Sequence, residues 1–397
     1  MEQVLEGIKV LDFSRYASAP TGTMLLADMG AEVIKVEKPG GSDDRDLGPF
    51  TPDGQSIAYG IVLSRNKKSI TLNLRSQEGK KILRKLVKTV DVVVHNFAVG
   101  SEEAEVLNYE SLKQDNPSLI LAVVTGFGQY GPYAERTCFD SIAQAISGAM
   151  SYTGFPGNPP TRAGAPYADF GAGFACALGV MFALHYRQKT GIGQLVDISM
   201  LDVAFTFVAG IGVAAEYKLL NYARSQQGNH SFYNYTNSFK TKDGWVMIGI
   251  VSNGLWRRFV RVIGREDLLK DPRCKDDMSR YLNSEFINSI VSPWMAEKTV
   301  DEVIALLEKA RLPCGRINSV GEAVNDPQLL AREMIVEIEQ PGAGKVPISG
   351  VSIKLSETPG EIRTPAPAPG EHSEEIYCGL LGFSPQEFLQ LKEKGII

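Results

Sequence analysis

An aspartate beside small residues is the strongest candidate for chemistry in this sequence. Asp169 follows Gly164–Ala168 and precedes Phe170–Leu184, an apolar stretch with three glycines that is typical of a buried helix. We therefore expect Asp169 to cap that helix, because backbone amides and the helix dipole keep a carboxylate ionised there. An ionised carboxylate can act as a nucleophile, and the neighbouring glycines would let a bulky substrate approach the backbone. The local sequence thus favours a helix cap and allows a catalytic nucleophile.

Two further segments could bind an anionic ligand. Arg65–Ser69 is rich in basic residues and Arg75 follows it, a pattern typical of either a solvated face or a set of phosphate contacts. Thr125–Pro132 is rich in glycine and directly follows an apolar segment. If that segment is a strand of an open parallel sheet, the turn lies where such sheets bind ligands. Otherwise it is a simple glycine-rich turn.

The first forty residues resemble half of a nucleotide-binding fold, without its phosphate-binding turn. Glu37 ends the second expected strand, where an acid would hold a ribose. The preceding turn, Ser14–Pro20, contains no glycine, so the dinucleotide fingerprint is missing. Ordinary NAD binding is therefore disfavoured, and a solvated strand end is the simpler interpretation of Glu37.

Composition excludes several classes of protein. The 397 residues include 41 Lys and Arg against 46 Asp and Glu, a net charge of −5 that argues against a general nucleic-acid binder. Five cysteines without a C-x-x-C pair and four scattered histidines predict no metal site, and reduced thiols in a cytoplasm. The acidic start lacks the basic residues of a secretory signal, and Phe170–Leu184 is too short to span a bilayer. We expect no membrane association.

Short apolar strands alternate with helices in the first half, which predicts an α/β fold with a parallel, doubly wound sheet. The expected strands are 8–13, 32–37, 69–74, 91–95, 119–124 and 194–199. The expected helices are 21–29, 78–88, 140–150, 171–185 and 200–217.

The second half predicts a smaller domain and a return to the first. We expect residues 1–200 to form a large domain, 201–224 a linker, and 225–325 a small α+β domain that contains a hairpin turning at Asp243-Gly244. Residues 326–350 are expected to be a linker, and 351–397 to return to the large domain, ending in a helix over 385–394.

A series of short segments, in order over nearly the whole chain, resembles the class III CoA-transferase family, which includes formyl-CoA:oxalate and carnitine CoA-transferases. The segments are Val10–Phe13, Gly30–Glu37, Asn66–Leu72, Asn96-Phe97, Thr125–Pro132, Ala143–Gly148, Asp169, Gly191–Gln194 and Gly370–His372. Each is weak alone, whereas the ordered set is specific. The resemblance implies a Rossmann-like large domain built from both chain ends, a smaller α+β domain inserted between them, and two such subunits interlocked as a homodimer.

The resemblance also implies a reaction between an acyl-CoA donor and a carboxylic acid acceptor. Asp169 would attack the acyl-CoA thioester to form a mixed anhydride and then an aspartyl-CoA thioester, from which CoA passes to the acceptor. Asp140 matches an acid that assists this aspartate in the family, and a cap of its own helix is the alternative role. The exchange needs no metal and no tightly bound cofactor, because one activated carboxyl derivative replaces another.

The same resemblance carries over residues that contact CoA. They are Ala17, Lys38, Leu72, Arg75, Asn96, Phe97 and Arg136. This chain departs from the family pattern in three places. Ala17 stands where some relatives have glutamine, Arg136 is adjacent to Thr137 at a family lysine position, and Ser101–Glu105 lacks a family arginine.

The sequence alone does not exclude three other functions. α-Methylacyl-CoA racemases share the fold, but their catalytic histidine would fall at Phe139, which cannot carry a proton. A CoA-binding subunit that needs a partner chain is a second alternative, although it would not require an intact Asp169. An NAD-dependent dehydrogenase is the least favoured, for want of the glycine fingerprint.

Overall fold

A computed structural model describes residues 3–397, and contacts divide the chain into two compact units. Among the described residues, the first unit contains 3–149, 162–223 and 328–397, and the second contains 150–161 and 224–327. Residues 201–223, expected as a linker, therefore lie in the first unit and form helices α8 (Met200–Ala209) and α9 (Val213–Leu220).

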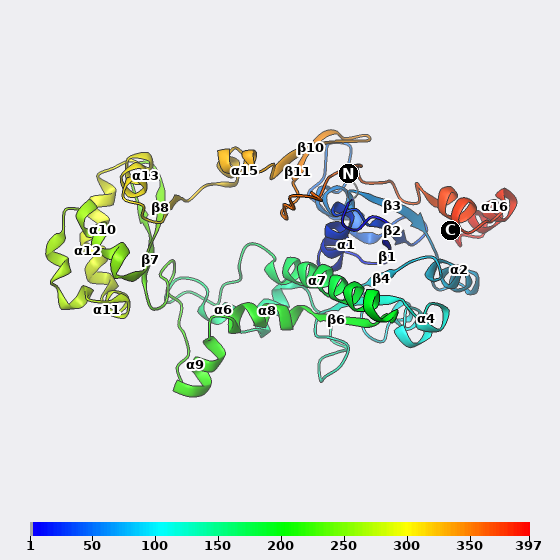
Figure 1. Ribbon diagram of the computed structural model, residues 1–397, viewed down its shortest axis with the longest axis horizontal. Helices are drawn as coiled ribbons and strands as arrows, with labels where there is room; N and C mark the ends of the chain where they lie inside the picture. The colour runs from blue at the N-terminus through cyan, green and yellow to red at the C-terminus, as the bar shows by residue number, and fades with distance from the viewer. Residues whose placement is uncertain (1–2) are drawn as a thin grey trace. The chain divides into compact units, whose positions relative to one another are not determined.

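A parallel sheet is the centre of the first unit (Figure 1). Within the described residues it has six strands in the order β3-β2-β1-β4-β5-β6, and all neighbouring pairs are parallel. The strands are β1 (Lys9–Asp12), β2 (Glu32–Glu37), β3 (Lys67–Thr71), β4 (Val92–His95), β5 (Ile120–Thr125) and β6 (Leu195–Ser199). The prediction of an α/β fold with a parallel sheet is confirmed.

Each face of this sheet has its own apolar core, because successive side chains of a strand point to opposite faces. On one face Val10, Val33 and Val92 pack with helices α1 (Ser18–Asp28) and α7 (Tyr167–Thr190). On the other face Leu11, Ile34 and Val93 pack with α2 (Gln77–Val87) and with Ile376 and Ile396 from the end of the chain. Burial on both faces explains why the central strands β4 and β5 are almost entirely apolar without alternation.

Two predicted helices of the first unit are each broken in two at a glycine with a positive φ. The predicted helix 200–217 is interrupted, because Gly212 has a φ of 82° and starts α9 after α8 has ended. The predicted helix 140–150 is two helices, α5 (Asp140–Ile146) and α6 (Ala149–Tyr152), separated at Gly148, which has a φ of 89°. Short helices α3 (Glu102–Val106) and α4 (Tyr109–Asp115) lie between β4 and β5.

Helix α7 extends farther than the apolar stretch that predicted it. It has 24 residues, and by length and composition it could cross a membrane, as could α8 and α9 if that bent pair were one span. The expectation that this stretch is too short was therefore wrong. Small residues let α7 approach α1, since a Cβ on Gly173 would come within 2.5 Å of Thr21.

The last segments of the first unit also hold more structure than expected. Residues 326–350 were expected to be a linker, but they include α15 (Pro327–Ala331) and the antiparallel pair β10 (Ile335–Gln340) and β11 (Gly344–Ser349). The chain then crosses to the large sheet. The Tyr377 hydroxyl donates to the Thr71 carbonyl at 2.6 Å, and the Asn73 amide donates to the Ile396 carbonyl at 2.8 Å. The remaining turns and helices are η1 (Asp43–Asp46), η2 (Ile57–Ile61), η3 (Val62–Ser64), η6 (Glu375–Leu380) and α16 (Pro385–Glu393).

The second unit is a three-stranded antiparallel sheet covered by helices. Strands β7 (Tyr235–Lys240) and β8 (Trp245–Ile250) form the predicted hairpin, and β9 (Cys314–Arg316) adds to β8. The covering helices and turns are α10 (Ser252–Val262), η4 (Glu266–Leu269), η5 (Pro272–Cys274), α11 (Asp277–Leu282), α12 (Ser284–Ala296), α13 (Val300–Lys309) and α14 (Val320–Ala323). This unit has its own apolar core around Tyr235, Phe259 and Ile287.

Candidate active site

Asp169 lies in the first turn of α7, but it does not cap the helix. The helix begins at Tyr167 and Pro166 stands at the cap position. The cap comes from Asp140, whose Oδ1 accepts the Ala168 amide at 2.9 Å and the Asp169 amide at 3.3 Å. The expectation that Asp169 caps α7 is therefore wrong, and so is the alternative that Asp140 caps its own helix, because Asp140 is already the first residue of α5.

The electrostatic surroundings of Asp169 also differ from the expectation. Burial raises the pKa of Asp169 to about 6, and the negative charge of Asp140 adds to the rise. Asp140 itself is buried, and its Oδ2 accepts the Gln144 side-chain amide at 2.6 Å. The side chain of Asp169 accepts no hydrogen bond from any residue in the described part of the chain, so its carboxylate is free to react. A carboxylate with a raised pKa is more basic than one held ionised by a cap.

A cavity of about 200 Å³ surrounds Asp169. Its wall contains the predicted residues Asn96, Phe97 and Arg136, and also Tyr16 and Phe139. Arg136 lies over the Tyr133 ring, with its guanidinium carbon 4.4 Å from the ring centroid. The cavity wall, all within residues 3–397, includes no histidine. A pair of His and Asp that could move an α-proton is therefore not assembled here.

Tyr16 is held in an unusual conformation at the edge of this cavity. Its φ is 63°, in the left-handed region that costs a residue with a Cβ. The Tyr16 amide donates to Asp44 Oδ2 at 3.0 Å, and the ring makes edge contacts with Phe139 at 5.9 Å and Tyr59 at 6.5 Å between centroids. Tyr16 and Asp44 could not be predicted as site residues from the sequence, because neither forms part of a motif.

A second cavity of about 430 Å³ lies where strands β1 to β4 end. The predicted residues Lys38 and Leu72 directly follow β2 and β3, and Phe97 comes two residues after β4. Predicted Arg75 also lines this cavity, and Phe97 lines both cavities. The carboxyl ends of parallel strands are the usual place for ligands in such sheets. Two cavities with one shared wall could hold the two parts of an extended substrate.

Arg15 is a cation of the second cavity that the sequence analysis missed. Asn96 fixes its backbone, accepting the Arg15 amide at 2.9 Å and donating to the Arg15 carbonyl at 2.7 Å. Its guanidinium carbon lies 5.0 Å from the centroid of the Phe97 ring. The available signal was its position three residues after the end of the first strand, where ligands bind.

Of the residues predicted to contact CoA, Ala17 lines neither cavity, and the predicted catalytic residue Asp140 also lies outside both linings. Ala17 is buried and packs with Met24, Leu25 and Leu63. Its neighbours Tyr16 and Ser18 contribute to the cavity of Asp169 instead.

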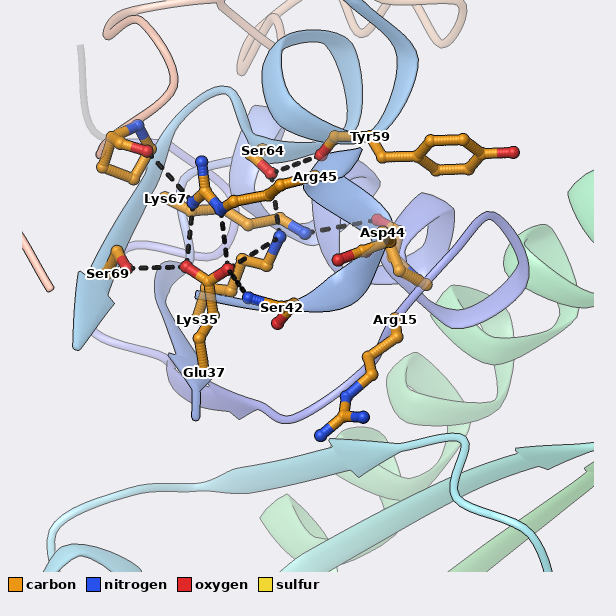
Figure 2. Close-up of polar contacts among 12 residues, drawn as sticks. Arg15, Lys35, Glu37, Ser42, Asp44, Arg45, Tyr59, Ser64, Lys67 and Ser69 are labelled. Carbon is orange, nitrogen blue, oxygen red and sulfur yellow. Dashed lines mark hydrogen bonds and ion pairs between the residues drawn. The ribbon is translucent and has the colours of Figure 1, made fainter. Parts of the chain in front are cut away.

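Glu37 is neither a solvated strand end nor free to hold a ribose. Its carboxylate is buried and accepts two hydrogen bonds from Arg45 at 2.7 and 2.8 Å, one from Ser69 Oγ at 3.0 Å, and one from the Ser42 amide at 3.1 Å (Figure 2). Burial alone would raise its pKa, but these bonds and the charge of Lys35 outweigh it and lower the pKa to about 2. Glu37 therefore fixes the end of β2 against the turn η1.

The basic run Arg65–Ser69 also has a structural role. Arg65 pairs with Asp28 at 2.7 Å and Lys67 with Asp12 at 2.9 Å, and all four side chains are buried. Neither alternative expected for this run, a solvated face or phosphate contacts, applies to these two cations. Figure 2 shows Lys67 directed into the interior, whereas Arg15 points away from the buried cluster.

No group of three or more His, Cys, Asp and Glu residues within 3–397 could hold a metal ion. All five cysteines are free thiols.

A parallel sheet with cavities at its strand ends, and a carboxylate with a raised pKa in one of them, is the arrangement of an α/β enzyme. The chain belongs to CoA-transferase family III, whose model matches residues 5–373, and it is a CoA-transferase. It is 36% identical to a succinyl-CoA–D-citramalate CoA-transferase of Chloroflexus aurantiacus over 99% of this chain and 98% of the relative. It is 34% identical to the alpha subunit of a succinyl-CoA–L-malate CoA-transferase of the same organism, over 99% and 92%.

Solved structures agree with this assignment. A CAIB/BAIF family protein from Brucella suis matches 96% of this chain and 100% of its own, with a TM-score of 0.83 and 32% identity.

Proposed function

We propose that this CoA-transferase acts through covalent intermediates on Asp169. A carboxylate oxygen of Asp169 attacks the thioester carbon, the C–S bond breaks, and CoA leaves as a thiolate while the acyl group and Asp169 form a mixed anhydride. The thiolate then attacks the aspartyl carbonyl, which releases the donor acid and leaves an aspartyl-CoA thioester. The acceptor carboxylate reverses both steps, and Asp169 is regenerated as a carboxylate. Each step exchanges one acyl bond for another.

One observation carries this proposal. The free carboxylate of Asp169 lies in a cavity that shares the Phe97 wall with a cation-lined cavity at the strand ends. A CoA thioester has a polyanionic nucleotide at one end and the reacting carbonyl at the other. We assign the nucleotide to the larger cavity and the carbonyl to the cavity of Asp169.

The residues that line the two cavities, and Asp140 beside them, have distinct roles in this proposal. Asp140 holds the backbone of Asp169, and its charge adds to the rise in the pKa of Asp169 that burial causes. Lys38, Arg75 and Arg15 face the phosphates, while Asn96 fixes Arg15. Arg136 is the cation of the Asp169 cavity and would meet the acceptor carboxylate. CoA enters as part of the substrate, and no tightly bound cofactor takes part.

The donor and acceptor follow from the relatives. Because two of them are named for succinyl-CoA, we propose succinyl-CoA as donor and a small dicarboxylic or hydroxy acid as acceptor. Incubation with a panel of acyl-CoA thioesters, intact mass and peptide mapping test the mechanism. A CoA-sized or acyl adduct on Asp169 supports it. Solvent deuterium entering the α-carbon of the acyl-CoA, with no adduct, would support the racemase alternative instead.

We further propose that two copies form the interlocked homodimer of the family, each with a large domain from both chain ends and an inserted small domain, in the cytoplasm. Support comes from an apolar groove of about 640 Å³ on the first unit. Its lining includes the large side chains Phe174, Leu178 and Met181, which lie along one side of α7 and are exposed in the single chain. Light scattering after size exclusion tests this: twice the chain mass supports it, and a monomer contradicts it.

A partner chain of related sequence is the alternative assembly, because one relative is named as an alpha subunit. Transferase activity of the purified single chain would exclude that requirement. Absence of activity with an intact, CoA-binding protein would favour it.

A further inference from the structure

The cations of the larger cavity already have partners. Arg75 pairs with Glu103, with 2.9 Å between Nη2 and Oε1, and Lys38 pairs with Asp43. Both acids line the same cavity as the cations. This arrangement is unexpected for a site that receives phosphates, because each acid lies where a phosphate would bind.

Arg15 completes an alternating set of charges. It has no carboxylate within ion-pair distance among residues 3–397, yet its charge contributes to lowering the pKa of both Asp43 and Glu103, after their stronger partners Lys38 and Arg75. For Glu103 these effects outweigh burial, which acts in the opposite direction. Three cations therefore meet these two acids, and the wall also includes Glu37, whose charge is already paired with Arg45.

The two acids are held by their own elements and not by the cations they pair with. Asp43 is the first residue of η1, and the two residues that follow it hold this turn in place by hydrogen bonds. The next residue, Asp44, accepts the Tyr16 amide, and Arg45 makes the paired bonds to Glu37. Glu103 lies in the first turn of α3, where Ser101 accepts the Ala104 amide. An arriving ligand can draw the long cationic side chains away, but the acids stay in the cavity.

The ion pairs are weak enough to exchange. The side chains of Lys38 and Arg75 are 50% and 70% exposed, and pairs at such positions are screened by water and salt. A phosphate of higher charge can therefore replace either acid as the partner of its cation.

We propose that Asp43 and Glu103 compete with the phosphate groups of CoA for Lys38 and Arg75. They occupy the cations of the empty cavity, lower its affinity for the nucleotide and speed its release after each turnover. This proposal rests on the proposed function, which places the nucleotide of CoA in this cavity.

The test measures the affinity of CoA directly by calorimetry at about 0.15 M salt, where distant charges are screened. Glu103→Gln and Asp43→Asn are each expected to lower the Kd for CoA about two- to fivefold, the range of exposed ion pairs. The double variant is expected to lower it about tenfold, and to increase the dependence of affinity on salt because more cation–phosphate contacts form.

Matched controls separate a local effect from net charge. The controls are Glu105→Gln, on the same helix α3 as Glu103, and Asp46→Asn, on the same turn η1 as Asp43. Neither Glu105 nor Asp46 forms an ion pair with any of residues 3–397. Each control variant makes the same change of net charge as its counterpart. Both should leave the Kd within about 1.5-fold of wild type, because their charges face solvent.

Two outcomes overturn the proposal. If Glu103→Gln and Asp43→Asn bind CoA as the wild type does, or more weakly, the acids orient the cations and do not compete. If Glu105→Gln and Asp46→Asn tighten binding equally, only net charge matters. Failure of wild type and all variants to bind CoA would instead remove the proposed function and this proposal with it. Thermal melting of each variant checks that the fold is intact.

Discussion

Asp140 binds the backbone of Asp169 and repels its side chain. The 3.3 Å bond from the Asp169 amide to Asp140 Oδ1 completes the cap of α7, while the charge of Asp140 contributes to raising the pKa of Asp169 to about 6. One acid thus positions the other and keeps it basic. Because a separate residue provides the cap, the carboxylate of Asp169 is left for the cavity.

The first prediction concerns pH. With a pKa of about 6, Asp169 becomes protonated below that pH and is then no longer a nucleophilic carboxylate. The acid limb of kcat/KM should therefore fall with a midpoint near pH 6, well above the midpoint of an ordinary aspartate. A pH–rate profile from pH 4.5 to 8.5 checks this. A flat profile down to pH 5 would contradict the raised pKa.

The second prediction separates the two roles of Asp140. Asp140→Asn keeps an acceptor oxygen for the helix amides but removes the charge, so the acid limb should move to lower pH. It loses the oxygen that accepts from Gln144, but because it keeps the cap it should destabilise the fold less than Asp140→Ala does. Asp140→Ala loses the cap as well and should destabilise the fold by about 1 kcal/mol. Urea unfolding and pH profiles of both variants measure the difference. Equal destabilisation by Asn and Ala would show that the cap contributes nothing.

The third prediction is that Asp169 lowers the stability of the fold. Its folded pKa lies above that of an unfolded aspartate, so the unfolded state binds fewer protons between about pH 4 and 6, and stability falls as pH rises through that range. Asp169→Asn should therefore abolish turnover yet stabilise the protein at pH 7, by up to about 3 kcal/mol. At pH 4 the gain should vanish. A variant less stable than wild type at pH 7 would contradict the burial cost.

The fourth prediction concerns the support of Tyr16. Asp44 is buried and its Oδ2 holds the Tyr16 amide, whereas its Oδ1 has no partner in the described part of the chain. Asp44→Ala should loosen the Tyr16 ring and lower kcat about tenfold, because small displacements in a reacting site are costly. The affinity for CoA should stay within about twofold, since Tyr16 lines the other cavity. Asp44→Asn keeps an acceptor and should retain most activity; equal loss in both variants would contradict this role.

The fifth prediction tests Arg15. Arg15→Ala should weaken CoA binding about tenfold and reduce its salt dependence, because a cation stacked on Phe97 is lost. Arg15→Lys keeps the charge but not the planar group, so it should restore only part of the affinity. Calorimetry with CoA measures both. Full recovery by lysine would show that the contact with Phe97 has no energetic role.

Local patterns predicted the sheet well because its signals are local. Continuous apolar strands separated by helices gave the strands of the parallel sheet, and the hairpin turn at Asp243-Gly244 was found from its two residues. Residues that follow strands, such as Lys38 and Leu72, could be placed near one edge for the same reason. The resemblance to a family placed Asp169 and Phe97 in the site.

The wrong predictions for Asp169 and Arg65 have a different cause: the role of each residue depends on a partner that is distant in the sequence. The cap of Asp169 comes from Asp140, and Arg65 is buried only because Asp28 lies beside it in the fold. The two residues of each pair are too far apart in the sequence for a local pattern to include both. The break between α8 and α9 was missed for another reason: Gly210 and Gly212 stand in an apolar run whose periodicity continues across them. The left-handed φ of Gly212 decided that break.

The wall of the nucleotide cavity has a consequence for the order of synthesis. Gly395 lines that cavity, and the Ile396 carbonyl accepts the Asn73 amide. The loop after β3 therefore gains its hydrogen-bond partner only when the ribosome has made more than 320 further residues, counted from Asn73 to Ile396. A nascent chain therefore carries Asp169 long before the last part of this cavity wall has been made, so the cavity is completed only when synthesis is nearly finished.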